Sequence, residues 1–376
     1  MKKVLYIHHG DINGGAPRSL KFILERMDSQ KYDATVVCRT SLEDAEFFKV
    51  PSVSKVILEK NIRPFHGSVV SGINFKQIIY NFVYALPTYF ATKKILKEVK
   101  PDIVHLNSTC LFMCARACKK VNKDIKVICH IREPLLPNFW GTLLRKGVFK
   151  PTDKFIAIDK FDCSTVDRKN KKSTVIYNFV DFKTYNTQIK SDVLRKELNL
   201  SNDDVIFLCL CRISPENGIT DAVKTWATTN IPSNAHLVIV GEIKDRQVEY
   251  TQKCHELATD KQNIHFLPFR KDIPDVIASS DIMLCSFAEP HFSRAIIEGA
   301  AMGKPAISKY IDGPKELVMD KKTGLFYDDK NNKLEDCVAL IMDKSLREKL
   351  GAQAEKYALD NFNAEINAEN TFREYE

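Results

Sequence analysis

The feature that most limits the fold of this chain is the alternation of short runs rich in Val and Ile with segments of helical length. Strands separated by helices pair in parallel, and helices then cover both faces of the sheet. The alternation therefore predicts an α/β protein built on parallel sheets. The strand-like runs are, in order, KKVLYIHH, ATVVC, SKVIL, DIVHL, KVICHI, DKFIAI, STVIYN, VIFLCLCRI, AHLVIVGE, NIHFLPF, DIMLCSF, PAISKY and GLFYD.

A polar stretch between residues 178 and 200 interrupts this alternation. A chain of 376 residues is long enough for two domains that each bury a core. We expect two Rossmann-like domains, residues 1–180 and 181–360, with parallel sheets facing a central cleft, and a terminal helix over 361–376 that packs back toward the first domain. Ligands of such sheets bind beyond the carboxyl ends of the strands, so functional residues are expected there.

The net formal charge of +8 is distributed unevenly. Residues 1–182 carry 31 Lys and Arg against 17 Asp and Glu, or +14, and the remainder carries −6. A basic first half favours an anionic partner, such as a membrane surface or a phosphate-bearing substrate. No helix-turn-helix, zinc-finger or RNP pattern accompanies the charge, so nucleic acid is not expected as a partner.

The sequence predicts a cytoplasmic protein. No secretion signal is apparent, and the most apolar longer window, Ile78–Leu96, contains too many polar residues to span a bilayer. That window is predicted to be a buried or peripheral helix. The odd number of cysteines, 11, fits a reducing compartment better than a disulfide framework. Cys110, Cys114 and Cys118 fall on one helix face, where we expect core packing and not a metal site.

Two motifs in the first half follow predicted strands. In GGAPRSL, Gly14 and Gly15 permit close backbone approach, and the helix that follows offers N–H groups to an anion or a sugar hydroxyl. In KVICHIREP, His130 stands at a strand end. A plain turn and a structural histidine remain open as alternatives for these two motifs.

Two further motifs follow strands in the second half. CLCRISPENGI places Arg212 at a strand end, where a guanidinium can bind a phosphate through two hydrogen bonds. AEPHFSRAIIEGAAMGKPAI places Glu289 after a strand and Glu298 inside the next helix. N–H groups at that helix start can hold a diphosphate, and a carboxylate in its first turns can accept hydrogen bonds from ribose hydroxyls. A surface arginine and a plain helix-start carboxylate remain open.

Taken together, nine landmarks resemble, in order, those of the family 4 retaining glycosyltransferases, also called glycosyltransferases group 1, which have the GT-B fold. The resemblance covers nearly the whole chain. It implies an enzyme that transfers a sugar from a nucleotide-sugar donor with retention at the anomeric carbon, with no required metal and no other cofactor. The donor would bind mostly to the second domain and the acceptor to the first. The landmarks are GGAPRSL, DIVHLNS, HIRE, VIYNFVD, CRISPENGI, HLVIVGE, NIHFLPFRKDIPDVIASSDIMLCSF, EPHFSRAIIEGAAMGKPAI and DGPKELVMDKKTGLFYD.

The resemblance assigns roles to single residues. Gly15 matches the glycine loop that faces the donor phosphates and the acceptor, and His130 matches a histidine near the transferred sugar. Arg212 matches the arginine that binds the diphosphate. Glu289 matches the first glutamate of a two-glutamate motif, near the sugar, and Glu298 matches the second, which holds the ribose. His130 and Glu289 are therefore the expected catalytic residues.

Five more residues belong to the expected donor site. Phe292, Ser293 and Arg294 match a Phe-Gly-x step whose backbone meets sugar and phosphate, with Ser in place of Gly. Phe269 and Arg270 match the region that borders the base.

The mechanism that the resemblance implies follows from charge. Breaking a glycosyl phosphate bond leaves negative charge on the diphosphate, which Arg212, the helix start near Ser293 and Arg294 would stabilise. The departing phosphate oxygen would take the acceptor proton. Glu289 would then position the sugar and not attack it.

Three positions depart from the family pattern. Asn217, among the expected donor-binding residues, stands where a lysine is usual and so removes one cationic contact to the diphosphate. Pro290 and His291 look like a one-residue insertion between the two glutamates, and Cys211 stands where Gly is usual. These departures bear on the donor site and leave the fold assignment unchanged.

The stretch Leu135–Lys150 combines Leu, Phe and Trp with three basic residues, in the manner of an interfacial helix. We expect Trp140, Arg145 and Lys146 to contact an anionic membrane surface, with the protein peripheral on the inner face of the membrane. A core-packed helix is the alternative.

The predicted function is that of a hexosyltransferase acting on a glycan or lipid-linked glycan acceptor in the synthesis of a surface polysaccharide or glycolipid. A non-hydrolysing sugar-nucleotide epimerase is one alternative, because it shares the two-domain architecture. A catalytically silent subunit that binds a sugar nucleotide or a partner enzyme is another, and Asn217 is the feature that favours it.

Overall fold

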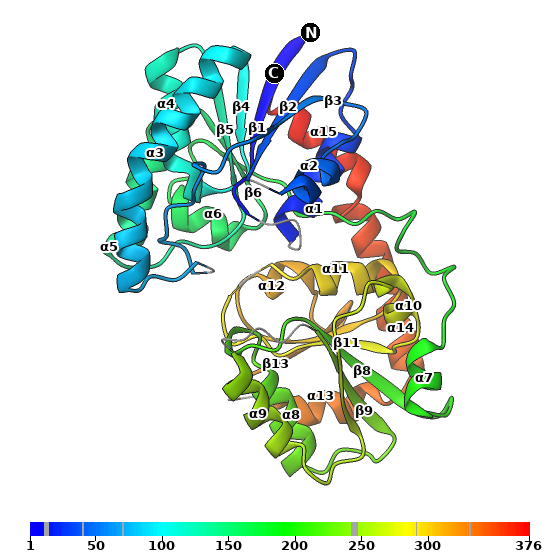
Figure 1. Cartoon of the computed structure of the whole chain (residues 1–376). Coiled ribbons are helices and arrows are strands. Elements are labelled where there is room, and N and C mark those ends of the chain that lie inside the picture. The colour runs from blue at the N-terminus through cyan, green and yellow to red at the C-terminus, as the bar shows by residue number, and fades with distance from the viewer. Residues whose placement is uncertain are drawn as a thin grey trace. The chain divides into compact units, whose positions relative to one another are not determined.

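A computed structural model describes residues 1–10, 15–39, 41–69, 71–241, 247–290, 292–328, 330 and 332–376 (Figure 1). The chain forms two compact units. The first comprises Met1–Asn178 together with Ala364–Glu376, and the second comprises Phe179–Asn363. Each unit is a parallel sheet between helices, as the alternation of strand and helix signals predicts.

The first unit contains a seven-stranded sheet in the order β3-β2-β1-β4-β5-β6-β7, and every paired strand is parallel. All seven predicted runs form strands. Their bounds are β1 (Lys2–Ile7), β2 (Tyr32–Cys38), β3 (Val53–Leu58), β4 (Ile103–Leu106), β5 (Lys126–Ile131), β6 (Lys154–Ala157) and β7 (Ser173–Val175).

Helices cover both faces of this sheet. The core on one face includes side chains of α3, α4, α5 and α6, and the core on the other includes side chains of α1 and of the segment after α15. The helices are α1 (Gly15–Glu25), α2 (Leu42–Phe47), α3 (Phe75–Val99), η1 (Thr109–Leu111), α4 (Phe112–Val121), α5 (Phe139–Phe149), α6 (Lys160–Val166) and α15 (Ala364–Arg373).

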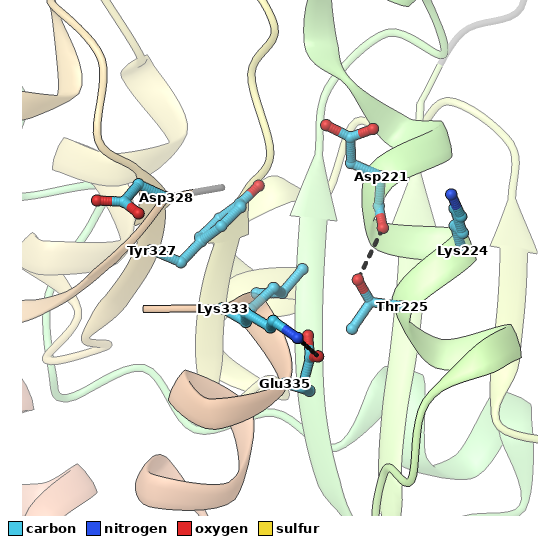
Figure 2. Close-up of a pocket in the computed structure, with 8 residues that line it drawn as sticks. Asp221, Lys224, Thr225, Tyr327, Asp328, Lys333 and Glu335 are labelled. Atoms are coloured by element: carbon cyan, nitrogen blue, oxygen red, sulfur yellow. Dashed lines mark hydrogen bonds and ion pairs between the residues drawn. The ribbon is translucent and has the colours of Figure 1, made fainter. Parts of the chain in front are cut away.

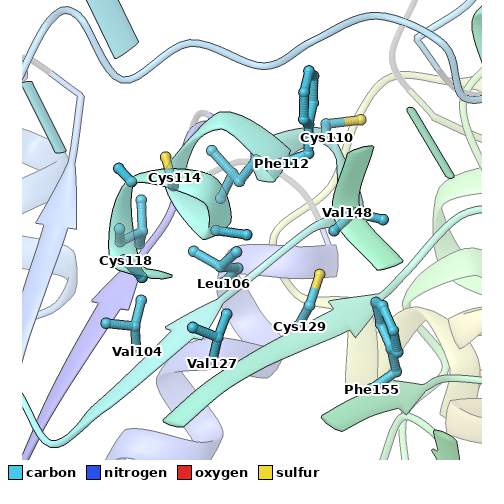
Figure 3. Close-up of a cluster of buried hydrophobic side chains, with 14 of the residues drawn as sticks. Val104, Leu106, Cys110, Phe112, Cys114, Cys118, Val127, Cys129, Val148 and Phe155 are labelled. Carbon is cyan, nitrogen blue, oxygen red and sulfur yellow. The ribbon is translucent and has the colours of Figure 1, made fainter. Parts of the chain in front are cut away.

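The three cysteines at helical spacing lie in the core of the first unit (Figure 3). Cys110 in η1 and Cys114 and Cys118 in α4 are each 2% exposed or less, and they pack among the branched side chains of β4 and β5. The prediction that they serve core packing is confirmed. The apolar window Ile78–Leu96 is the middle of α3, a peripheral helix, and no helix in the described ranges is long and apolar enough to cross a bilayer.

The second unit contains a six-stranded sheet in the order β10-β9-β8-β11-β12-β13, again parallel throughout. All six predicted runs form strands. The elements are α7 (Val193–Leu198), β8 (Val205–Leu210), η2 (Pro215–Asn217), α8 (Ile219–Thr228), β9 (Ala235–Val240), α9 (Val248–Leu257), β10 (Ile264–Leu267), α10 (Ile273–Ala278), β11 (Ile282–Cys285), α11 (Arg294–Ala301), β12 (Ala306–Lys309), α12 (Pro314–Leu317), β13 (Gly324–Tyr327), α13 (Leu334–Ile341) and α14 (Lys344–Asn361).

The last residues of the chain are anchored in the first unit. Tyr375 is fully buried, and its hydroxyl lies 2.7 Å from the Tyr6 hydroxyl and 2.5 Å from Nδ1 of His105. At the start of α15, Arg26 donates a hydrogen bond of 3.0 Å to Glu365. The chain thus returns to the sheet on which it began. The division of the units into an acceptor side and a donor side stays a prediction.

We expect Gly218→Ala to destabilise the second unit strongly. Gly218 has φ +64°, and a Cβ there would lie 2.0 Å from the carbonyl oxygen of Ser286, in the loop after β11. The left-handed conformation costs an alanine about 1–2 kcal/mol, and relieving the backbone clash adds about 1–3 kcal/mol. Gly303→Ala is the matched control, because Gly303 has φ +69° but its Cβ would meet only a methyl group of Thr187 at 3.2 Å. Urea unfolding measures both, and equal losses of stability would contradict the prediction.

We also expect His105 to make the stability of the first unit depend on pH. Burial and the charge of Arg132 lower the pKa of His105 to about 3. An unfolded histidine has a pKa of about 6.5. Between pH values of about 6.5 and about 3 the unfolded state therefore binds more protons than the folded state, and the free energy of unfolding decreases as the pH falls through this range. His105→Gln should reduce the loss between about pH 7 and pH 5 by up to about 1.4 kcal/mol per pH unit, measured by urea unfolding. The exposed His255→Gln serves as control, and parallel curves for wild type and His105→Gln would refute the expectation.

Candidate active site

In the second unit, the loop after β8 carries two of the predicted donor-binding residues. Arg212 is exposed just beyond the strand end, and Asn217 ends the short helix η2. The Asn217 side chain donates a hydrogen bond of 2.7 Å to the main-chain carbonyl of Arg212. Asn217 therefore closes the loop that presents Arg212.

The loop after β11 is bonded directly to the loop after β8. The N–H groups of Ala288 and Glu289 donate to the carbonyl of Glu216 at 3.0 and 3.3 Å, and the Ser286 hydroxyl donates to the carbonyl of Asn217 at 3.2 Å. Glu289 is exposed at this edge. The structure thus brings Glu289 next to the loop of Arg212, although 77 residues separate their positions in the chain.

Helix α11 begins where the sequence predicts a phosphate-facing turn. Phe292 and Ser293 are buried, and the Ser293 hydroxyl caps the helix by accepting a hydrogen bond of 3.4 Å from the N–H of Ile296. Arg294 donates through Nε to Oε1 of Glu298 at 3.2 Å. The predicted contacts of Arg294 with the phosphates and of Glu298 with the ribose stay predictions. His291, at the predicted insertion, lies outside the described residues.

The guanidinium of Arg294 reaches a second group. Its Nη2 donates to the carbonyl of Phe179 at 3.3 Å, at the segment where the chain enters the second unit. Glu298 is only 5% exposed, so this ion pair is largely shielded from water and holds the first turns of α11 to the entry segment.

Phe269 and Arg270 follow β10 and differ in what they offer to a base. The ring of Phe269 is 55% exposed. Arg270 binds Asp272 at 2.6 Å and Glu197 at 2.5 Å, and these hydrogen bonds raise its pKa. The guanidinium is thus engaged with two carboxylates, whereas the phenyl ring is available for stacking.

A cavity of about 250 Å³ lies between α8, the end of β13 and the start of α13 (Figure 2). Its lining contains three acids and two lysines, so its formal charge does not favour an anionic donor. None of the predicted site residues lines it. The sequence analysis missed this cavity. The predicted strand GLFYD ends beside the cavity, and ligands bind beyond the carboxyl ends of parallel strands, so this strand end could have indicated a site. The lining residues are Asp221, Lys224, Thr225, Tyr327, Asp328, Lys333, Leu334 and Glu335.

In the first unit, His130 is the last residue but one of β5 and is 3% exposed. Its Nδ1 lies 2.8 Å from Nε2 of His105 and 3.3 Å from Nη2 of Arg132. Burial and the charge of Arg132 lower the pKa of His130 well below its ordinary value. The imidazole is therefore neutral at neutral pH.

A hydrogen-bond network joins His130 to the start of α1. Arg132 donates through Nε to Oδ1 of Asn107 at 2.9 Å, and Asn107 donates to the carbonyl of Ala16 at 3.2 Å. Ala16 follows Gly15, the exposed first residue of α1, while Gly14 lies outside the described residues. The two predicted first-half motifs thus share one network, which the sequence analysis did not anticipate. The signal was Asn107, which directly follows strand β4 in DIVHLNS.

The residues predicted to contact a membrane lie on α5 and differ in exposure. Trp140 is half-buried, with its ring 6.3 Å from that of Phe65 and 6.1 Å from that of Phe82 on α3. Arg145 is half-buried and lines a cavity of about 210 Å³, and Lys146 is exposed. A membrane role for these residues stays a prediction.

Two family models match consecutive parts of the chain. The model described as glycosyltransferase family 4 matches residues 13–184, and the model described as glycosyl transferases group 1 matches residues 190–357. They meet near the boundary between the two compact units.

Curated relatives are similar at low identity over most of the chain. N-acetyl-alpha-D-glucosaminyl L-malate synthase of Bacillus anthracis is 22% identical, over 80% of this chain and 84% of the relative. UDP-Gal:alpha-D-GlcNAc-diphosphoundecaprenol alpha-1,3-galactosyltransferase of Escherichia coli is also 22% identical, over 93% of this chain and 92% of the relative.

Solved structures show the same fold. HepE of Anabaena, solved in complex with UDP and glucose, has a TM-score of 0.77 and 19% identity, and the match covers 99% of each chain. This likeness confirms the predicted GT-B class, with two Rossmann-like units. Given the two family models, the thirteen strands in the predicted order and the GT-B likeness, the chain belongs to the family 4, group 1 glycosyltransferases.

Proposed function

We propose that this glycosyltransferase transfers a sugar, with retention at the anomeric carbon, from a nucleotide-sugar to a lipid-linked glycan acceptor during synthesis of a surface polysaccharide or glycolipid. The observation that carries the proposal is the pair of bonded loops that presents Arg212 and Glu289 at one edge of the second sheet. The activities in the names of the Escherichia coli relative and of a Campylobacter jejuni transferase support a lipid diphosphate acceptor.

In the proposed mechanism, the second unit binds the donor diphosphate without a metal. Arg212 binds the phosphates, and the N–H groups at the start of α11 add partial positive charge. As the glycosyl bond breaks, negative charge grows on the leaving diphosphate, and these preorganised groups stabilise it. Glu289 positions the sugar, and the leaving phosphate oxygen takes the acceptor proton. The exposed ring of Phe269 stacks on the base.

Two alternatives remain to be separated from this proposal. An epimerase would convert the sugar nucleotide without an acceptor, and a silent subunit would give no product. Asn217 favours the second alternative, because it stands where the family has a lysine.

We expect one class of nucleotide-sugar to stabilise the protein in a thermal-shift screen of UDP-, GDP-, ADP- and CMP-sugars. A donor present at about 100 times its Kd adds about 2.7 kcal/mol of stability. Arg212→Ala should abolish the shift, because it removes the cation at the diphosphate. Asn217→Lys should tighten donor binding if the added charge outweighs the lost hydrogen bond to the carbonyl of Arg212. No donor binding by wild type or by Asn217→Lys would favour the silent subunit.

Product analysis with the labelled donor then identifies the reaction. Transfer to an undecaprenyl-diphosphate-linked sugar, with the anomeric configuration of the donor, supports the proposal. An epimer formed without acceptor, or an inverted linkage, would overturn it.

We further propose that the protein docks on the inner face of a membrane through α3. Six of its large apolar side chains are 48% to 76% exposed. They recur at intervals of one helical turn, so they form a single stripe along the helix. An exposed stripe of this length on a monomer marks an interaction surface. The residues are Phe75, Ile79, Phe82, Val83, Leu86 and Phe90.

The charge beside this stripe favours an anionic lipid surface. From Phe75 to Lys97 the helix contains no acid, and Lys94 and Lys97 are exposed beyond its apolar part. Helix α5, which meets α3 where the Phe82 and Trp140 rings lie 6.1 Å apart, also contains no acid. Apolar area together with lysines is the combination that binds interfacial helices to anionic lipids.

We expect the protein to sediment with phosphatidylglycerol vesicles. Phe82→Ser combined with Leu86→Ser should weaken binding at least about tenfold, because two exposed apolar side chains no longer enter the interface. Leu340→Ser is the control, since Leu340 is 52% exposed on α13 of the other unit. Trp140 is a poor choice for this test because its half-buried ring packs on the core. Docking by α3 would be refuted if the wild-type protein did not sediment with the vesicles, or if the double variant bound them as tightly as the wild type.

A further inference from the structure

Four buried side chains form a continuous hydrogen-bonded chain that ends at His130. The Tyr6 hydroxyl lies 2.7 Å from the Tyr375 hydroxyl, which contacts Nδ1 of His105. Nε2 of His105 lies 2.8 Å from Nδ1 of His130. Each contact admits either polarity, but because every member donates one proton, the choice at one link fixes all the others.

The Tyr6 end of the chain selects one polarity. Tyr6 is fully buried, and its hydroxyl has the Tyr375 hydroxyl as its hydrogen-bond partner among the described residues. If Tyr375 donated to Tyr6, the Tyr6 proton would be buried without an acceptor, which is costly. Tyr6 therefore donates to Tyr375, and Tyr375 donates to Nδ1 of His105.

The His130 end favours the same polarity. Arg132 places Nη2 3.3 Å from Nδ1 of His130, and a guanidinium can only donate. This contact favours Nδ1 of His130 as an acceptor, which then also accepts the shorter bond from Nε2–H of His105. A proton on Nδ1 would face the Arg132 N–H in a buried site.

We propose that Tyr375 and His105 are positioning residues that hold His130 in the tautomer protonated at Nε2. His130 then meets its ligand as a hydrogen-bond donor. Among the described residues, no group hydrogen-bonds Nε2 of His130, so this N–H is free to serve a ligand. The consequence of this tautomer for catalysis rests on the proposed function, whereas the assignment of the tautomer does not.

Donation from Nε2 has a chemical consequence. A neutral imidazole protonated at Nε2 cannot remove a proton from a substrate at that atom, so His130 orients a sugar hydroxyl and does not act as a base there. The lowered pKa values of His105 and His130 agree with two neutral rings. Tyr375, 270 residues from His105 in the chain, thereby helps to set what His130 offers to the ligand.

Two-bond ¹⁵N–¹H NMR correlations of the whole protein test the proposal, because protonated and unprotonated ring nitrogens have well-separated ¹⁵N shifts. In wild type we expect His130 to be protonated at Nε2 alone. Tyr375→Phe removes the donor to His105 and leaves only the longer 3.3 Å contact of Arg132 to favour one tautomer, so His130 should show a mixture of tautomers. Tyr6→Phe is the matched control: it also deletes a buried hydroxyl, but it leaves Tyr375 free to donate, so His130 should keep the wild-type signature.

The NMR measurement tests the tautomer of His130 and requires no enzymatic activity. Protonation of His130 at Nδ1 in wild type overturns the proposal even if no variant folds, and so does an unchanged tautomer in a folded Tyr375→Phe. In a transfer assay, Tyr375→Phe should lower kcat about fivefold to tenfold with little change in KM, and Tyr6→Phe should not. If wild type transfers no sugar, the proposed function fails while the tautomer result stands.

Discussion

The candidate site of the second unit depends on two backbone hydrogen bonds, from the N–H groups of Ala288 and Glu289 to the carbonyl of Glu216. They join the loops that follow β8 and β11, which are neighbouring strands of a parallel sheet. Because the bonds are made by the main chain, side chains on both loops can vary without separating them. Gly218 is where a side chain would break this contact, since its Cβ would enter the space of the Ser286 carbonyl.

In the first unit, side chains and not main-chain groups hold the functional segments together. Asn107 and Arg132 tie the strand end at His130 to the start of α1, and Tyr375 reaches the same strands from the C-terminal segment. Buried polar networks of this kind impose a single arrangement only when each member is satisfied. The network therefore gives His130 a defined protonation pattern as well as a defined position, which a main-chain frame could not do.

The local elements of this protein were predictable, and its long-range contacts were not. All thirteen strands follow from short apolar runs, and placing Arg212, Glu289 and His130 at or just beyond strand ends follows from the parallel topology. The pairing of Arg294 with Glu298 could have been expected from their i, i+4 spacing. The contact of Tyr375 with His105 could not, because no local pattern records it. The exposed stripe of α3 was missed because this helix buries the polar residues Asn81, Thr88 and Thr92, whereas the usual pattern buries the apolar face.

The charges around the proposed donor site bear on the effect of having Asn217 where the family usually has a lysine. Arg294 is paired with Glu298, and Arg270 is paired with Asp272 and Glu197. Among these three arginines, Arg212 alone has no carboxylate partner within the described part of the chain. A site with one unpaired guanidinium neutralises little of the diphosphate in the ground state. Catalysis, however, depends on interactions that strengthen as charge develops on the leaving group, so weak neutralisation of the bound donor does not imply a slow reaction.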